Sequence, residues 1–250
     1  MEETTCLSLI NVPKKGVSTE KRCKKERVCL KPCFSEHTAF EIGIDEAGRG
    51  PLFGRVYVAA VILPKDDSFR HELMCDSKKI HNRKKIHELS TLIKTTAIDW
   101  HIEYVEADVI DQINIRQAVL RAMHECAKQV IEKTPDKKHA LLVDGNDFTP
   151  HTTFNTETQQ IECVPFETIE GGDNTYTCIA AASILAKHER DTYMEELCIQ
   201  YPVLERHYGL SKNMGYGTKT HRDGIIEHGI TQWHRKTYGI CKESPLNHVI

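Results

Sequence analysis

The stretch GIDEAGRGPLFG, residues 43–54, decides how the rest of the sequence is interpreted. An apolar run, which predicts a β-strand, ends here at two adjacent acids, Asp45 and Glu46. An arginine between two glycines follows at once, as Gly48, Arg49 and Gly50. Because glycine has no side chain, such a loop lets the backbone approach a ligand closely. The stretch therefore predicts a binding loop next to a pair of negative charges.

The segments that follow this loop predict an α/β fold. Alternating or continuous apolar residues predict strands over 39–48, 55–64, 97–107, 139–146 and 161–173. Apolar residues at helical spacing predict helices over 78–96, 107–132 and 175–202. The first two strands are close enough in the sequence to form a hairpin. This order of elements favours a mixed sheet flanked by helices.

The composition limits the possible partners and compartments. The net charge is -3 over 250 residues, so binding to nucleic acid would depend on local basic patches. No apolar run is long enough to cross a membrane. Ten cysteines without a CxxC pair, and no secretory signal, favour a reducing compartment, and we expect a cytoplasmic protein.

The N-terminal residues 1–38 differ in composition from the rest. The segment KKGVSTEKRCKKERVCLK, residues 14–31, is strongly basic and lacks apolar periodicity, which favours a solvated, flexible tail. A nuclear-import signal or an arm that binds nucleic acid is the alternative, and it leaves a nuclear or viral setting open. The cysteines in this region, Cys23, Cys29 and Cys33, fit no zinc-binding pattern well.

Four acids share one kind of position in the expected sheet. Asp45 and Glu46 end the first strand, Asp144 ends the strand ALLVD, and Asp173 ends the strand that leads into Gly171-Gly172. Ligands of open α/β sheets bind beyond the strand ends, so these acids are expected to meet at one edge. A cluster of carboxylates repels itself unless it holds cations, and oxygen ligands favour Mg²⁺ or Mn²⁺. Taken singly, each acid could equally be a helix cap or a turn residue.

One geometrical condition applies to the first two acids. Neighbouring residues of a regular strand face opposite sides, so Asp45 and Glu46 would share a site only where the pleat breaks. The pair Ala47-Gly48 favours such a break.

Five motifs, in this order, resemble those of ribonuclease HII, the type 2 ribonuclease H: GIDEAGRGPLFG, DSKKI, LLVDGN, GGD followed by AAASILAKHERD, and GYGTKTH. The resemblance covers about residues 40–240. It implies a ribonuclease H-like catalytic domain over 39–240 with a helical C-terminal part, followed by a tail over 241–250.

The resemblance also implies roles for individual residues. It makes Asp45, Glu46, Asp144 and Asp173 the catalytic, metal-binding acids. It makes Gly48, Arg49 and Gly50 the loop that recognises a ribose 2′-hydroxyl, and Tyr216 the ring that packs on the following deoxyribose. It further suggests Lys78, Lys79 and Lys187 as contacts to the duplex backbone.

The implied function is an endoribonuclease that works in DNA replication and repair. Such an enzyme cuts RNA/DNA hybrids, and duplex DNA with single embedded ribonucleotides, on the 5′ side of the ribonucleotide. It leaves a 3′-hydroxyl and a 5′-phosphate, with Mg²⁺ or Mn²⁺, two ions in all, as cofactors. We expect a monomer without membrane contact. The alternatives are a noncatalytic nucleic-acid-binding protein on the same fold, or a related nuclease such as a resolvase or integrase.

Several basic residues have two interpretations. Arg49 could contact a phosphate or form a salt bridge with one of the acids. Lys187 and Arg190 resemble family positions near the scissile phosphate, but salt bridges are an equal alternative. His234 and Arg235 could touch DNA, although a clasp that holds the end of the chain is favoured.

Three features depart from the family pattern. Met214 and Gly171 stand where basic residues are usual, so we expect weaker duplex binding, with a shallower dependence on salt. The stretch between Asp144 and Asp173 is longer than usual, and TTFNTETQQ, residues 152–160, is expected to form an exposed loop.

Overall fold

A computed structural model of the chain describes residues 29–38, 40–80, 82–155 and 158–247. Of the tail expected over 1–38, residues 1–28 therefore lie outside the described residues. Residues that follow it are attached to the main body: Lys31 pairs with Tyr176 in an isolated bridge. The buried carboxylate of Glu41 accepts hydrogen bonds from the N–H groups of Phe34 and Ser35, at 2.8 and 2.7 Å.

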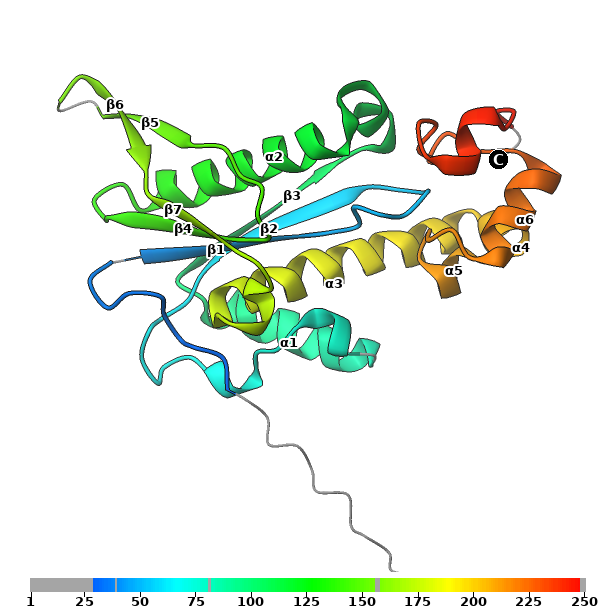
Figure 1. The fold of residues 1–250 in the computed structure, drawn as a ribbon. Helices are drawn as coiled ribbons and strands as arrows, with labels where there is room; N and C mark the ends of the chain where they lie inside the picture. The colour runs from blue at the N-terminus through cyan, green and yellow to red at the C-terminus, as the bar shows by residue number, and fades with distance from the viewer. Residues whose placement is uncertain (1–28, 39, 81, 156–157, 248–250) are drawn as a thin grey trace, which may run out of the picture.

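A five-stranded mixed sheet in the order β3-β2-β1-β4-β7 forms the centre of the molecule (Figure 1). Its strands are β1 (Phe40–Ala47), β2 (Val56–Ile62), β3 (Asp99–Val105), β4 (His139–Asp144) and β7 (Phe166–Ile169). Strands β1, β2 and β3 are antiparallel neighbours, which confirms the expected hairpin, whereas β4 and β7 run parallel to β1. All seven residues of β2 are buried, because helices cover both faces of the sheet.

Helices form a layer on each face of the sheet, and a group of short helices lies beyond the C-terminal end of α3 (Figure 1). They are α1 (Arg83–Thr96), α2 (Ala107–Lys133), α3 (Thr177–Gln200), α4 (Pro202–Tyr208), α5 (Leu210–Asn213) and α6 (Lys219–His228). One core cluster joins the sheet to α2 and the other joins it to α3 and α1. None of the helices in the described part combines the length and apolar character needed to cross a bilayer.

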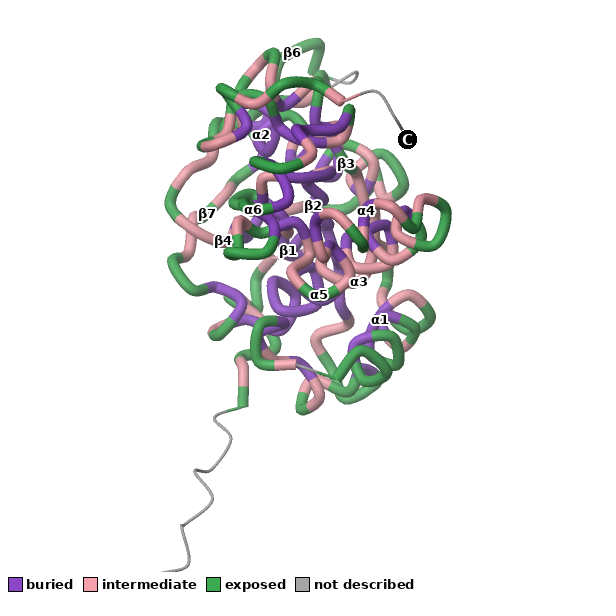
Figure 2. The backbone as a smooth tube through the Cα atoms, turned by 90° about the vertical axis from the view of Figure 1, so that its right-hand side faces the viewer, coloured by how far each residue is buried: buried purple, intermediate pink, exposed green. Residues whose placement is uncertain are grey.

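Helix α3 lies very close to the central strand β1. A Cβ atom added to Gly43 would lie 2.2 Å from the backbone carbon of Cys178, so only glycine permits this approach. Figure 2 shows the resulting core: the buried backbone runs through β1 and β2, while the outer side of α1 is exposed.

Two predictions between Asp144 and Asp173 are wrong. The single strand expected over 161–173 is divided at Pro165 into β6 (Gln160–Val164) and β7, which belong to different sheets. The loop expected over 152–160 instead contributes β5 (His151–Asn155), which pairs with β6. The pair projects from the main sheet (Figure 1), so its outward side chains are polar or exposed and give no core pattern in the sequence.

Candidate active site

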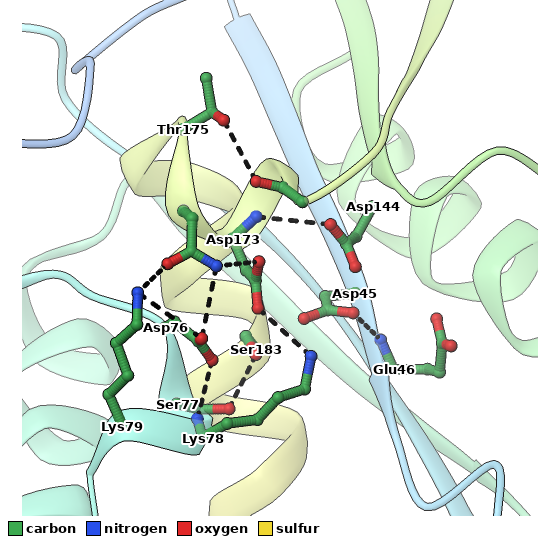
Figure 3. A network of polar contacts seen from close by, with 12 residues as sticks. Asp45, Glu46, Asp76, Ser77, Lys78, Lys79, Asp144, Asp173, Thr175 and Ser183 are labelled. Carbon is green, nitrogen blue, oxygen red and sulfur yellow. Dashed lines mark hydrogen bonds and ion pairs between the residues drawn. The ribbon is translucent and has the colours of Figure 1, made fainter.

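Three of the four predicted acids meet at one edge of the sheet (Figure 3). Strands β1 and β4 are parallel neighbours with Ile44 paired to Val143, so the next residues, Asp45 and Asp144, lie side by side. Asp173 belongs to η3 (Gly172–Asn174), the 3₁₀ turn that follows β7, the neighbour of β4. Its backbone N–H donates to Oδ1 of Asp144 at 3.4 Å. The parallel arrangement thus brings together acids that are far apart in the sequence.

Glu46 reaches the site from the other face of β1. Pairing between β1 and β2 continues without interruption through Ala47. The break of the pleat that we expected between the two acids is therefore absent. The left-handed backbone occurs at Gly48, with φ of 98°, after the acids. Asp45 and Glu46 still line the same cleft, because the site lies at the strand end. The N–H of Glu46 donates to Oδ1 of Asp45 at 2.7 Å.

Burial, with a smaller contribution from neighbouring charges, raises the pKa values of three of the acids, Asp45, Glu46 and Asp173. Burial raises the pKa of Asp45 well above its ordinary value, and the charges of Glu46 and Asp144 raise it further. Burial also raises the pKa of Asp173, with a further contribution from Asp144. Burial is the main cause of the raised pKa of Glu46 as well. The site thus holds more negative charge than its own surroundings compensate.

Two cations oppose this charge only in part. Nζ of Lys78 lies 3.5 Å from Oδ2 of Asp173, and its side chain is largely exposed. Nε of Arg49 lies 3.3 Å from Oε1 of Glu46. Of the two interpretations that the sequence allowed for Arg49, the structure shows the salt bridge to an acid.

The chemistry of these donors fits a hard divalent cation. Among the residues that the structure describes, no three His, Cys, Asp or Glu side chains are drawn together as a ready-made metal site. The donors are nevertheless all carboxylate oxygens, which Mg²⁺ and Mn²⁺ prefer. Burial is the main cause of the raised pKa of Asp45, and a bound cation would relieve the repulsion by Glu46 and Asp144 that raises it further.

A cleft of about 840 Å³ opens beside the acids. Its lining includes nine of the eleven predicted site residues: Asp45, Glu46, Gly48, Arg49, Gly50, Lys78, Asp144, Lys187 and Tyr216. The other two are Asp173, which is 2% exposed and contacts Lys78, and Lys79. Lys79 bonds instead to the side chain of Asn174 and lies 3.8 Å from Asp76 (Figure 3).

The glycine–arginine loop lies next to the predicted tyrosine. A Cβ atom added to Gly50 would lie 3.8 Å from Cε1 of Tyr216, whose side chain is half exposed in the cleft. Arg190 packs beneath both: its Nη2 donates to the carbonyl of Met214 at 2.6 Å, and its guanidinium lies 5.7 Å from the centre of the Tyr216 ring. Lys187, by contrast, forms a salt bridge with Asp191 at 2.7 Å, which is the alternative to a position near the scissile phosphate.

Two serines near the acids were not predicted from the sequence. Ser77 and Ser183 share a hydrogen bond of 2.9 Å between their hydroxyls, and both line the cleft. A hydrogen bond from Ser183 partly offsets the raised pKa of Asp45. The available signal was AAASILA, where a single hydroxyl lies among apolar residues on a buried helix.

Known proteins resemble this chain over most of its length. A family model described as Ribonuclease HII matches residues 42–240. A protein named Ribonuclease HII from Parabacteroides distasonis is 43% identical over 210 residues, which cover 84% of this chain and 95% of that protein. Another, from Endomicrobium trichonymphae, is 43% identical over 83% of this chain and 87% of its own length.

Solved structures share the fold at lower identity. The PCNA:RNase HII complex from Archaeoglobus fulgidus contains a chain with a TM-score of 0.60 and 23% identity, over 80% of this chain and 96% of that one. Bst-RNase HIII in complex with Mn²⁺ has a TM-score of 0.54 and 15% identity, over 80% of this chain and 71% of that one.

Proposed function

The chain belongs to the ribonuclease HII family and is a ribonuclease H, and from that premise we propose its substrates and the position of its cut. The substrates are RNA/DNA hybrids and duplex DNA with single embedded ribonucleotides. The cut falls on the 5′ side of the ribonucleotide and leaves a 3′-hydroxyl and a 5′-phosphate. The observation that carries the proposal is one cleft lined by acids from β1 and β4, the glycine–arginine loop and Tyr216.

We propose Asp45, Glu46, Asp144 and Asp173 as the ligands of two Mg²⁺ or Mn²⁺ ions. Bound ions would supply an activated water for attack on the phosphorus and would stabilise the departing 3′ oxygen. Asp45 and Asp144 stand on adjacent strands, so both are held by backbone pairing rather than by a mobile loop. Such rigid support suits a site that must fix the position of a phosphodiester.

Recognition of the ribonucleotide falls to the loop and the tyrosine. Because Gly48 and Gly50 carry no side chains, the loop backbone is able to come within hydrogen-bonding distance of a 2′-hydroxyl, the group that distinguishes RNA from DNA. The half-exposed ring of Tyr216 presents an apolar face to a sugar beside it. The exposure of Lys78 and its position 3.5 Å from Asp173 support our proposal that its Nζ contacts a backbone phosphate.

The test compares wild-type protein with Asp45→Asn on a duplex that contains one ribonucleotide, in Mg²⁺ or Mn²⁺. Wild type should cut once, 5′ of the ribonucleotide, and should leave the same duplex uncut when it is all DNA. Asp45→Asn should bind but lose cleavage by several orders of magnitude. Its thermal unfolding should show an intact fold, because the raised pKa of Asp45 means that a neutral side chain is tolerated there.

Other outcomes would contradict the proposal. Binding without cleavage by wild-type protein would indicate a noncatalytic nucleic-acid-binding protein. Preferential cleavage of branched DNA would indicate a resolvase-like nuclease.

A further inference from the structure

Arg235 is the largest fully buried side chain among the described residues, with 0% exposure. It follows α6 in the C-terminal segment, yet its guanidinium lies under the loop that follows β1. It donates to four carbonyl oxygens there, at distances of 2.7 to 3.0 Å. They belong to Gly48, Arg49, Pro51 and Gly54. The clasp favoured from the sequence is therefore present, and what it holds is the glycine–arginine loop.

The backbone around Arg235 continues this attachment. The N–H of Arg235 donates to the carbonyl of Leu52 at 2.8 Å, and the N–H of Gly54 donates to the carbonyl of Trp233 at 2.8 Å. Phe53 and His234 form an antiparallel bridge between the two segments. Residues 233–235 thus pair with the loop through an isolated β-bridge and the two hydrogen bonds that flank it.

The outer side of this segment is anchored on helix α2. Both carboxylate oxygens of Asp111 accept hydrogen bonds from it: the N–H of Lys236 at 2.7 Å, and the N–H and hydroxyl of Thr237 at 2.9 and 2.6 Å. Arg235 is therefore fixed from both sides, by the loop and by α2.

The bonds to Arg235 set the direction of the peptide groups in the loop. In a planar trans peptide the carbonyl of one residue and the N–H of the next point in opposite directions. The carbonyls of Gly48 and Arg49 point inward to the guanidinium, so the N–H groups of Arg49 and Gly50 point away from it. Both of these residues line the cleft. The N–H of Leu52, placed by the same rule, donates to the carbonyl of Gly215, next to Tyr216.

A lysine at this position would not reproduce this arrangement. A buried cation is tolerated only where its donors are paired, and the guanidinium offers five N–H donors in a fixed plane. A lysine ammonium is a single point with three donors, and it would leave loop carbonyls unpaired.

We propose that Arg235 is a positioning residue for ribonucleotide recognition. It never touches the substrate, but it turns the loop carbonyls inward and thereby presents the N–H groups of Arg49 and Gly50 to the 2′-hydroxyl. The inference rests on the proposed function, in which this loop distinguishes ribose from deoxyribose.

The test measures binding in an Asp45→Asn background, so that no substrate is cut. The dissociation constant is determined for a duplex with one ribonucleotide and for the same duplex made only of DNA. The ratio of the all-DNA constant to the ribonucleotide constant reports recognition of the 2′-hydroxyl alone, since phosphate contacts contribute equally to both. Arg235→Lys should reduce this ratio by about tenfold, the order expected for one lost hydrogen bond, with nearly unchanged affinity for all-DNA duplex.

Two further variants separate positioning from general loss of stability. Tyr208→Phe removes a buried hydrogen bond to the carbonyl of Gly229 in the same C-terminal part, so it should lower the melting temperature and leave the ratio unchanged. Tyr238→Phe removes the hydroxyl that donates to the carbonyl of Arg49 at 3.2 Å, in a partly exposed position where folding is not at risk. It should reduce the ratio by a smaller factor, and it keeps the test valid if Arg235→Lys does not fold.

The possible outcomes are distinct. If the Asp45→Asn parent shows no preference for the ribonucleotide, the proposed function fails before Arg235 is tested. If the parent shows the preference and a folded Arg235→Lys keeps it, the inference is overturned. It is overturned equally if Arg235→Lys weakens both duplexes by the same factor, or if Tyr208→Phe changes the ratio as much.

Discussion

Gly48 is constrained in two ways, by its backbone and by its neighbour. Its φ angle of 98° is a conformation that L side chains rarely adopt. A Cβ atom there would also lie 2.4 Å from Nε and 2.6 Å from Cδ of Arg190. That side chain is only 3% exposed and is held by its bond to Met214, so it has little room to move.

Replacement of this glycine should therefore cost more than backbone strain alone. Gly145 offers a matched control, because its φ is 90° and an added Cβ would meet nothing within 4 Å. We expect Gly145→Ala to lower the free energy of unfolding by about 1–2 kcal/mol, from strain alone. Gly48→Ala should lose roughly 1–3 kcal/mol more, from the overlap with Arg190. Urea denaturation of both variants measures the difference, and equal losses would show that Arg190 yields freely.

A buried pair of histidines joins helix α6 to the segments on either side of it. Nδ1 of His234 accepts from the N–H of Thr231 at 2.9 Å, which leaves its Nε2–H to donate to Nε2 of His221 at 3.1 Å. Nδ1 of His221 then donates to the carbonyl of Tyr216 at 3.1 Å. Every ring nitrogen is satisfied only while both rings are neutral.

This pairing should make the fold sensitive to acid. Burial, with the neighbouring His221, lowers the pKa of His234 to about 3. The unfolded state takes up its proton first, near pH 6.5, so the contribution to stability is complete above that pH and is lost as the pH falls toward 3. At pH 5 the loss from His234 alone should be about 2 kcal/mol.

Urea denaturation at pH 7.5 and pH 5 checks this expectation. Wild-type protein should lose stability between the two, and His234→Gln should lose about 2 kcal/mol less over the same interval, although it starts from a lower value. An identical pH dependence of the two proteins would contradict the neutral pair.

The elements that were predicted well from the sequence are those whose apolar residues follow strand or helix spacing along their whole length. Strand β1 and helix α3 are apolar enough to be recognised locally, and the acids at the strand ends follow from the parallel order. Strand β5 was missed, and β6 was expected only as part of one strand with β7, because exposed residues such as Phe154 and Ile161 leave little buried face to detect. Arg235 was expected to form a clasp, but what it holds could not be predicted, because its partners lie more than 180 positions earlier in the chain.

For the whole molecule, binding of a divalent cation should stabilise the folded state. The acids repel one another at the edge of the sheet, and a ligand that binds only the folded chain raises its free energy of unfolding. Addition of Mn²⁺ should therefore raise the melting temperature, by about 2–4 °C for each kcal/mol of binding free energy, and a chelator should reverse the shift.

The matched control for this effect is an acid outside the site. Asp45→Asn should largely abolish the shift with Mn²⁺. Asp147→Asn makes the same chemical change at an acid that pairs with Arg116 on α2, so it should keep the shift. Equal shifts in all three proteins would place the cation elsewhere.

The attachment of residues 233–235 to the loop has a consequence for biosynthesis. The four acids have all left the ribosome long before Arg235 does, so a nascent chain carries the complete set of proposed metal ligands while its loop still lacks the guanidinium. Recognition of ribose should then begin only after Arg235 itself has left the ribosome. Messages cut short just before codon 235 would yield proteins that keep their carboxylates but do not distinguish ribose from deoxyribose.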